Sequence, residues 1–192
     1  MGHQRYFKKT VLIISIIFAL VICPIIIHAE DARLSDFVVT NNRDHLLLYF
    51  SVENCFKPEL SRAIESGLET TFTFFVRLYE RQEWWWDKNL RSIEIRHSIK
   101  YDHLKNIYKV KLSEQENKVI SVKGFDEAKK LMSDVVSLKV IPLHYLKKGQ
   151  RYQIQMMANM DRVNLPFYLH YVFFFVSFWD FETDWHTIDF RY

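Results

Sequence analysis

The chain has 192 residues, with 26 lysines and arginines against 23 aspartates and glutamates. The first 29 residues hold three of the basic residues and no acidic one, so the remainder carries 23 of each sign and no formal net charge. A neutral domain lacks the clustered basic face that nucleic-acid binding requires, and we exclude that class of partner. Four glycines, four prolines and 16% aromatic residues also exclude a disordered chain.

Residues 1–29 have the pattern of an export signal, in which three basic residues precede an uncharged apolar run over residues 11–27. Ala29 suits the last position before a cleavage site, whereas Ile27 fits the third-last position poorly. If the signal is retained, the uncharged stretch of 19 residues from Thr10 to His28 is close to the ~20 residues of a membrane-spanning helix. We therefore expect residues 30–192 to form one exported domain, either periplasmic or tethered to the inner membrane by residues 11–27.

The domain has a single cysteine, Cys55, because Cys23 lies within the apolar run. An internal disulfide is therefore excluded, and we expect Cys55 to be a small buried hydrophobe. The bulky residue before Cys23, Ile22, argues against a lipid-attachment site there.

Apolar and polar residues alternate along most of the domain, which is typical of strands with one buried face. In the clearest strand, residues 92–101, His97 and Tyr101 lie on the same face as three isoleucines. The run over residues 70–81 has few polar interruptions and predicts a central strand that is covered on both faces. The predicted strands, in chain order, cover residues 36–41, 45–52, 70–81, 92–101, 108–112, 119–123, 138–145, 151–160 and 185–192.

Two short helices are predicted between the strands. The first begins at Pro58 and ends at Gly67, which suit the first helical position and the C-terminal stop. For the second we expect Asp126 as the N-cap, with an apolar face that extends to Val135. The predicted fold class is α+β, a mostly antiparallel β-sheet or sandwich with two short packed helices.

Three consecutive tryptophans, Trp84, Trp85 and Trp86, follow the predicted central strand. One interpretation is an aromatic platform exposed to a sugar, a lipid headgroup or a protein partner. The other is a plug in which one tryptophan caps the end of the sheet, since neighbouring strand residues point to opposite faces.

A second aromatic run covers residues 165–179 and includes Phe178 and Trp179. It is shorter than the ~20 residues of a membrane helix, and it lacks the charged face of an interfacial helix. A buried strand explains the run, and so does an apolar surface that contacts the bilayer or a partner.

The sequence contains a weak candidate metal site, because alternate residues of an extended chain share one face. The four residues concerned are Asp180, Glu182, Asp184 and His186. A solvated turn is the competing interpretation, since three adjacent carboxylates on one strand repel. We predict no catalytic residues and no cofactor, because the chain has neither a Gly-x-Ser-x-Gly elbow nor a glycine-rich phosphate loop.

Several segments resemble the bacterial exported proteins of domain-of-unknown-function family 4390. These segments are residues 68–87 with the tryptophans, residues 93–101 with the strand at Tyr108, residues 125–132, and the tail from Leu165-Pro166 through Trp179-Asp180-Phe181 to Asp184-Trp185. The family has no established activity, so the resemblance implies an exported or envelope-associated bacterial protein and no catalytic residues.

From these observations we expect a non-enzymatic module of the bacterial cell envelope. Its partner would be an envelope protein or a lipid or membrane surface, contacted through Trp84, Trp85, Trp86, Phe178 and Trp179. A periplasmic carrier of an apolar or lipid-like ligand is the alternative, followed by a hydrolase, metal-dependent or other. The sequence leaves the oligomeric state open.

Overall fold

Two antiparallel sheets form most of the domain in the computed structural model, which describes residues 31–160 and 181–192. The smaller sheet has the order β1-β2-β7 and the larger has the order β6-β5-β4-β3-β8-β9. Together with two α-helices, these sheets confirm the predicted α+β class. The elements are β1 (Arg33–Asn41), β2 (His45–Glu53), α2 (Pro58–Glu65), β3 (Thr70–Glu80), β4 (Lys88–Asp102), β5 (Ile107–Leu112), η1 (Ser113–Gln115), β6 (Lys118–Val122), α3 (Phe125–Ser133), β7 (Asp134–Pro142), η2 (Leu143–Tyr145), β8 (Arg151–Met160) and β9 (His186–Arg191).

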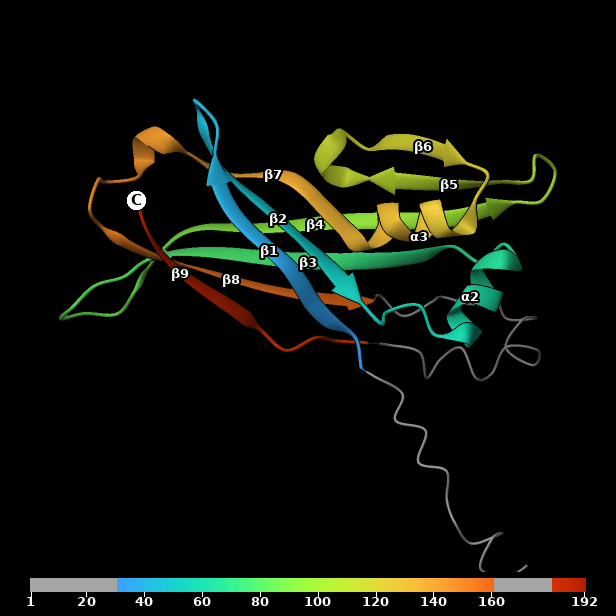
Figure 1. Cartoon of the computed structure of the whole chain (residues 1–192), viewed down its shortest axis with the longest axis horizontal. Helices are drawn as coiled ribbons and strands as arrows, with labels where there is room; N and C mark the ends of the chain where they lie inside the picture. Colours follow the sequence, from blue (N-terminus) through green and yellow to red (C-terminus); the bar gives the residue numbers. More distant parts are fainter. Residues whose placement is uncertain (1–30, 161–180) are drawn as a thin grey trace, which may run out of the picture. The chain divides into compact units, whose positions relative to one another are not determined.

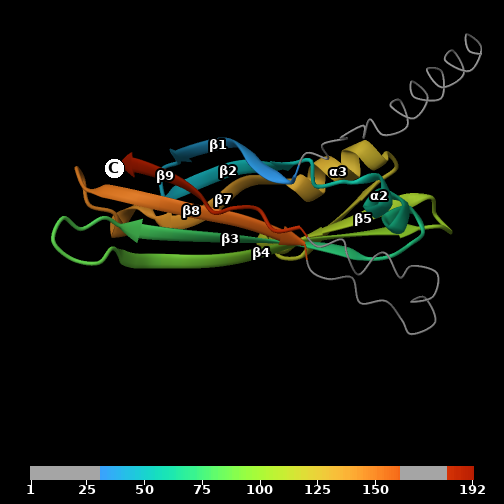
Figure 2. The ribbon, with the colours of Figure 1, turned by 90° about the horizontal axis from the view of Figure 1, so that it is seen from below.

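The sheets lie in two layers, with β1 and β2 running across β3, β4 and β8 (Figures 1 and 2). Both views place the β3–β4 loop at one end of these layers and α2 at the opposite end. The strands that flank this loop are the longest in the described part of the chain, β3 with 11 residues and β4 with 15. They therefore carry the loop away from the helices.

Strand β3 lies at the centre of the larger sheet, between β4 and β8. Its alternate residues Phe72, Phe74, Val76 and Leu78 are at most 1% exposed and face the smaller sheet. The opposite face is covered only in part, because Arg77 is exposed and Phe75 and Tyr79 are half-buried. The central position is as predicted, but complete cover of both faces is wrong for this strand.

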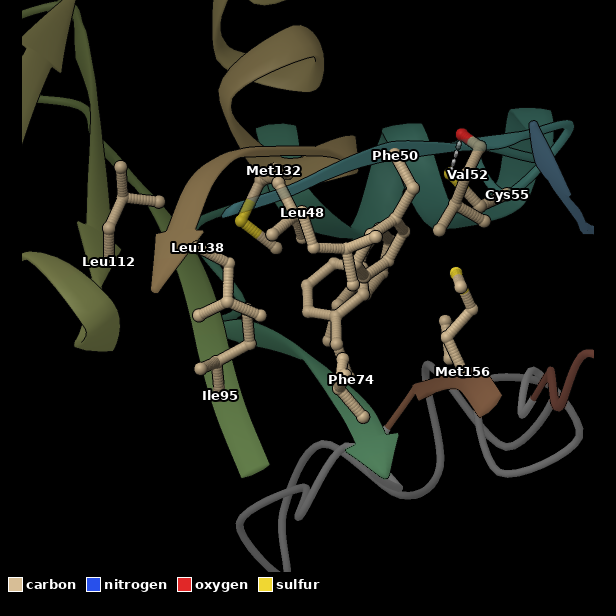
Figure 3. Close-up of a cluster of buried hydrophobic side chains, with 14 of the residues drawn as sticks. Leu48, Phe50, Val52, Cys55, Phe74, Ile95, Leu112, Met132, Leu138 and Met156 are labelled. Atoms are coloured by element: carbon tan, nitrogen blue, oxygen red, sulfur yellow. Dashed lines mark hydrogen bonds between the residues drawn. The ribbon is translucent and has the colours of Figure 1, made fainter. Parts of the chain in front are cut away.

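Side chains from the two sheets interlock in one core, shown in Figure 3. The ring of Phe50 on β2 meets the ring of Phe74 on β3 edge-on, with 5.8 Å between centroids. Cys55 is 5% exposed and its thiol donates to the carbonyl oxygen of Val52 at 3.4 Å, as the figure also shows. Cys55 is therefore the buried residue that the sequence predicts.

Helix α2 follows the sequence prediction closely. It begins at Pro58, and its buried face consists of Leu60, Ala63 and Ile64. Gly67 has a φ of +91°, and its N–H donates to the carbonyl oxygen of Ile64 at 2.9 Å. This left-handed conformation favours glycine after a helix end, as the sequence indicates.

Helix α3 begins and ends differently from the prediction. Its N-cap is Gly124, so Asp126 lies within the first turn and is not the cap. Val135, expected on the helical face, belongs to β7 and pairs with Phe50 on β2. Strand β7 therefore starts at Asp134 and ends at Pro142, while the predicted strand covered residues 138–145. Pairing with β2 and burial of Val135 to 1% exposure outweigh the helical spacing.

Candidate functional site

The β3–β4 loop, residues 81–87, carries the three consecutive tryptophans outside the sheet. Trp84, Trp85 and Trp86 are 88%, 79% and 93% exposed. The structure contradicts the interpretation of this cluster as a core plug, because none of the three indoles enters the core. We call residues 81–87 the Trp loop.

Polar contacts close the Trp loop at its base. The guanidinium of Arg81 donates from Nη1 to Oδ2 of Asp87 at 2.7 Å, and the N–H of Gln82 donates to Oδ1 of Asp87 at 3.2 Å. From the loop directly before β8, the side-chain amide of Gln150 donates to the carbonyl oxygen of Arg81 at 2.7 Å. These contacts fix the two ends of the loop and leave the three indoles outside the bonded base.

An open hollow of about 730 Å³ lies beside the Trp loop. Trp84 and Trp85 contribute to its wall, and so do the side chains of Arg81, Arg151 and Arg191. Two of these arginines have acidic partners, since Arg81 pairs with Asp87 and Arg151 pairs with Glu83 at 3.3 Å. The site is therefore amphiphilic, with indoles next to guanidinium groups.

Sequence reasoning did not find this arginine group. Arg81 directly follows β3, Arg151 lies on β8 and Arg191 lies on β9, so they come together only through the order of strands in the larger sheet. Each of the three arginines lies within a predicted strand, so the sequence does place them on strands. To group them, one must also know that β3 pairs with β8 and that β8 pairs with β9, which local sequence patterns do not specify.

The predicted metal residues do not assemble into a metal site in the described part of the chain. Glu182 and Asp184 are exposed, and the imidazole of His186 stacks on the ring of Phe37 with 3.8 Å between centroids. Across residues 31–160 and 181–192, no group of three acidic, histidine or cysteine residues could hold a metal ion. Asp180, Phe178 and Trp179 lie outside the described residues, as does the aromatic run over residues 165–179.

His97 is buried with both ring nitrogens bonded. It is 0% exposed, with Nδ1 at 3.0 Å from the carbonyl oxygen of Met132 and Nε2 at 3.1 Å from Oε1 of Glu114. Burial alone would raise the pKa of the Glu114 carboxyl, but the hydrogen bond and charge of His97 outweigh it and lower that pKa. The expected buried face for His97 is confirmed, and the contacts indicate a structural pair.

Cys55 is a poor nucleophile in this environment. Burial raises the pKa of its thiol to about 12, with a smaller opposing effect from a backbone hydrogen bond and a further rise from Asp134. Only the thiolate is strongly nucleophilic, so very little reactive sulfur is present near neutral pH.

The fold and this site define a β-rich α+β domain with an exposed aromatic loop beside a basic hollow. Residues 29–189 match the family model described as Domain of unknown function (DUF4390), and the chain belongs to this family. Comparisons with curated proteins and with solved structures gave no match. Among the described residues, no helix combines the length and apolar character needed to cross a membrane.

Proposed function

We propose that this protein is a non-enzymatic docking module of the bacterial cell envelope, and that its Trp loop enters the lipid–water boundary of a membrane. The observation that carries the proposal is the exposure of three consecutive indoles, each at least 79% accessible. A large aromatic side chain gains roughly 1.5–3 kcal/mol when it leaves water, so this loop exposes considerable unused binding energy. An exposed apolar group of this kind is typical of a binding site.

A lipid boundary suits the shape of the loop better than a protein pocket does. The indoles of Trp84, Trp85 and Trp86 are each at least 79% exposed on a loop outside the sheet, so none of them is held against the domain. A fluid interface can surround a protruding loop from several sides. Tryptophan is also enriched at membrane interfaces, because its ring is apolar and its N–H finds polar partners.

The N-terminal pattern adds the cellular setting to the proposal. Residues 1–29 direct export across the inner membrane, and the domain is then periplasmic or tethered by residues 11–27. A tether would hold the domain near the same membrane surface. An envelope protein as the partner of the Trp loop is the competing outcome of the test below.

Hydrogen exchange of the purified full chain, without lipid and with phosphatidylcholine vesicles, tests the proposal. We expect vesicles to slow amide exchange in residues 81–88 and to leave the β4–β5 turn, residues 102–107, unchanged. Replacement of Trp84, Trp85 and Trp86 by alanine should abolish the slowing and change the free energy of unfolding by no more than about 0.5 kcal/mol, because the side chains are exposed.

The matched control is Leu104→Ala, which removes another exposed apolar side chain (97% accessible) from the β4–β5 turn. This variant should retain the lipid effect on the Trp loop. Unchanged exchange of residues 81–88 in the unsubstituted chain would reject membrane docking and favour a protein partner. An unfolded triple variant would show that the indoles stabilise the fold.

A further inference from the structure

Three arginines form a row across neighbouring strands at the base of the Trp loop. Arg151 on β8 and Arg191 on β9 are direct register partners. Arg81 comes directly after β3, and its N–H donates to the carbonyl oxygen of Arg151 at 2.9 Å. Strands in a sheet are about 4.8 Å apart, and directly opposed residues face the same side. All three side chains accordingly line one hollow; we call them the arginine row.

The arginine row is costly for the isolated fold, because like charges that oppose each other directly across a strand pair are destabilising. The available acids relieve this cost only in part. Arg81 pairs with Asp87, and Arg151 pairs with Glu83 while both side chains are more than half exposed. Exposed ion pairs of this kind contribute little. Within residues 31–160 and 181–192, Arg191 has no ion pair.

The row also keeps hydrogen-bond donors free for a ligand. Each guanidinium has five N–H groups, and the ion pairs of Arg81 and Arg151 use one nitrogen each. Asp189 lies nearby and accepts a hydrogen bond from the side-chain amide of Gln153 at 3.1 Å. Gly149 also lines the hollow, and no heavy atom lies within 4 Å of the position that a Cβ would take on it. The hollow is therefore open on this side.

These features define the chemistry of an occupant. Guanidinium groups bind phosphate in a bidentate manner, and Trp84 and Trp85 offer an apolar wall in the same hollow. We propose that the arginine row binds the phosphate of an anionic phospholipid in the membrane that the Trp loop enters. This inference rests on the proposed function and adds the class of lipid that the site prefers.

A lipid titration that follows the emission of the loop indoles tests the inference. In the full chain, Trp179→Phe and Trp185→Phe leave only the indoles of the Trp loop as reporters. We expect phosphatidylglycerol vesicles to half-saturate the emission change at a lipid concentration about 10- to 30-fold lower than phosphatidylcholine vesicles, by the usual effect of two arginines at an anionic surface. Salt should reduce this preference, because it screens exposed charges.

Arg151→Gln with Arg191→Gln should abolish the preference and leave binding to phosphatidylcholine unchanged. Its unfolding midpoint should not fall, because the substitutions remove a repulsive pair. The matched control, Arg62→Gln with Arg96→Gln, removes two exposed arginines outside the row, each of which has an acidic partner, and it should keep the preference.

Each other outcome would overturn the inference in an identifiable way. An equal loss of preference in both double variants would indicate an effect of net charge alone. If the Arg151/Arg191 variant keeps the preference for phosphatidylglycerol, the arginine row does not bind the lipid phosphate. Membrane docking by the Trp loop would be unaffected by that result. Complete competition by inorganic phosphate at constant ionic strength would make the row a site for free phosphate. No emission change with either vesicle would reject the proposed function itself.

Discussion

Buried His97 has two hydrogen-bond partners, the carbonyl oxygen of Met132 and the carboxylate of Glu114. The carbonyl oxygen of Met132 accepts only, so Nδ1 of His97 carries a hydrogen, and Nε2 faces the carboxylate of Glu114. The buried position of His97 was predictable from strand alternation, but its partner was not. Glu114 reaches it from the 3₁₀ turn η1, which the sequence pattern does not indicate.

This pair predicts a pH dependence of stability. The pKa of Glu114 is lower in the folded protein, so its contribution is complete above the ordinary carboxyl range and is lost as the pH falls through the lowered value. Glu114→Gln should cost on the order of 3 kcal/mol at neutral pH, since it leaves the buried imidazole without its charged partner.

Denaturant unfolding at several pH values measures this effect. The Glu114→Gln variant should lose less stability on acidification than the unsubstituted chain does. Glu69→Gln, at an exposed position, serves as the control and should keep the normal acid dependence. Equal acid dependence in all three chains would contradict the assigned role of the pair.

At the scale of elements, strand positions could be read from the sequence wherever alternation was regular. Strand β8 has its predicted bounds, and the bounds of β4, β5, β6 and β9 differ from the prediction by at most four residues. The boundary between α3 and β7 could not be read in this way. Val135 fits the helical period, and only its pairing with Phe50 across the smaller sheet assigns it to a strand.

Two valine-to-alanine substitutions, one buried on β3 and one exposed on β6, test the assignment of the core face. Val76→Ala removes methyl groups from a side chain that is 1% exposed, and it should cost about 2–3 kcal/mol. Val119→Ala on β6 makes the same chemical change at a side chain that is 54% exposed, and it should cost no more than about 0.5 kcal/mol. Urea unfolding of both variants checks the difference. Equal losses would contradict the assignment of the core face.

At the scale of the molecule, the Trp loop and the arginine row lie together at one end of the domain. Lysines and arginines balance the acidic residues after residue 29, yet three arginines gather at the base of the Trp loop. The helix α2 lies at the opposite end of the layers (Figures 1 and 2). Local pattern identified the tryptophans as a candidate site, whereas the strand order was required to find the arginines next to them.

The central claim is that the Trp loop enters a lipid boundary, and the contact of its indoles with lipid tests that claim most directly. The measurement is fluorescence quenching of the full chain by phosphatidylcholine with brominated acyl chains. One chain carries Trp179→Phe and Trp185→Phe, so that only the loop indoles report. A second chain carries Trp84→Phe, Trp85→Phe, Trp86→Phe and Trp179→Phe, so that only Trp185, beside Arg77 of the sheet, reports.

We predict strong quenching and a blue shift for the loop indoles, with neither effect for Trp185. Emission that stays unquenched in the first chain would contradict membrane docking by the Trp loop. Equal quenching in both chains would contradict it as well, because the loop would then have no particular place at the lipid surface.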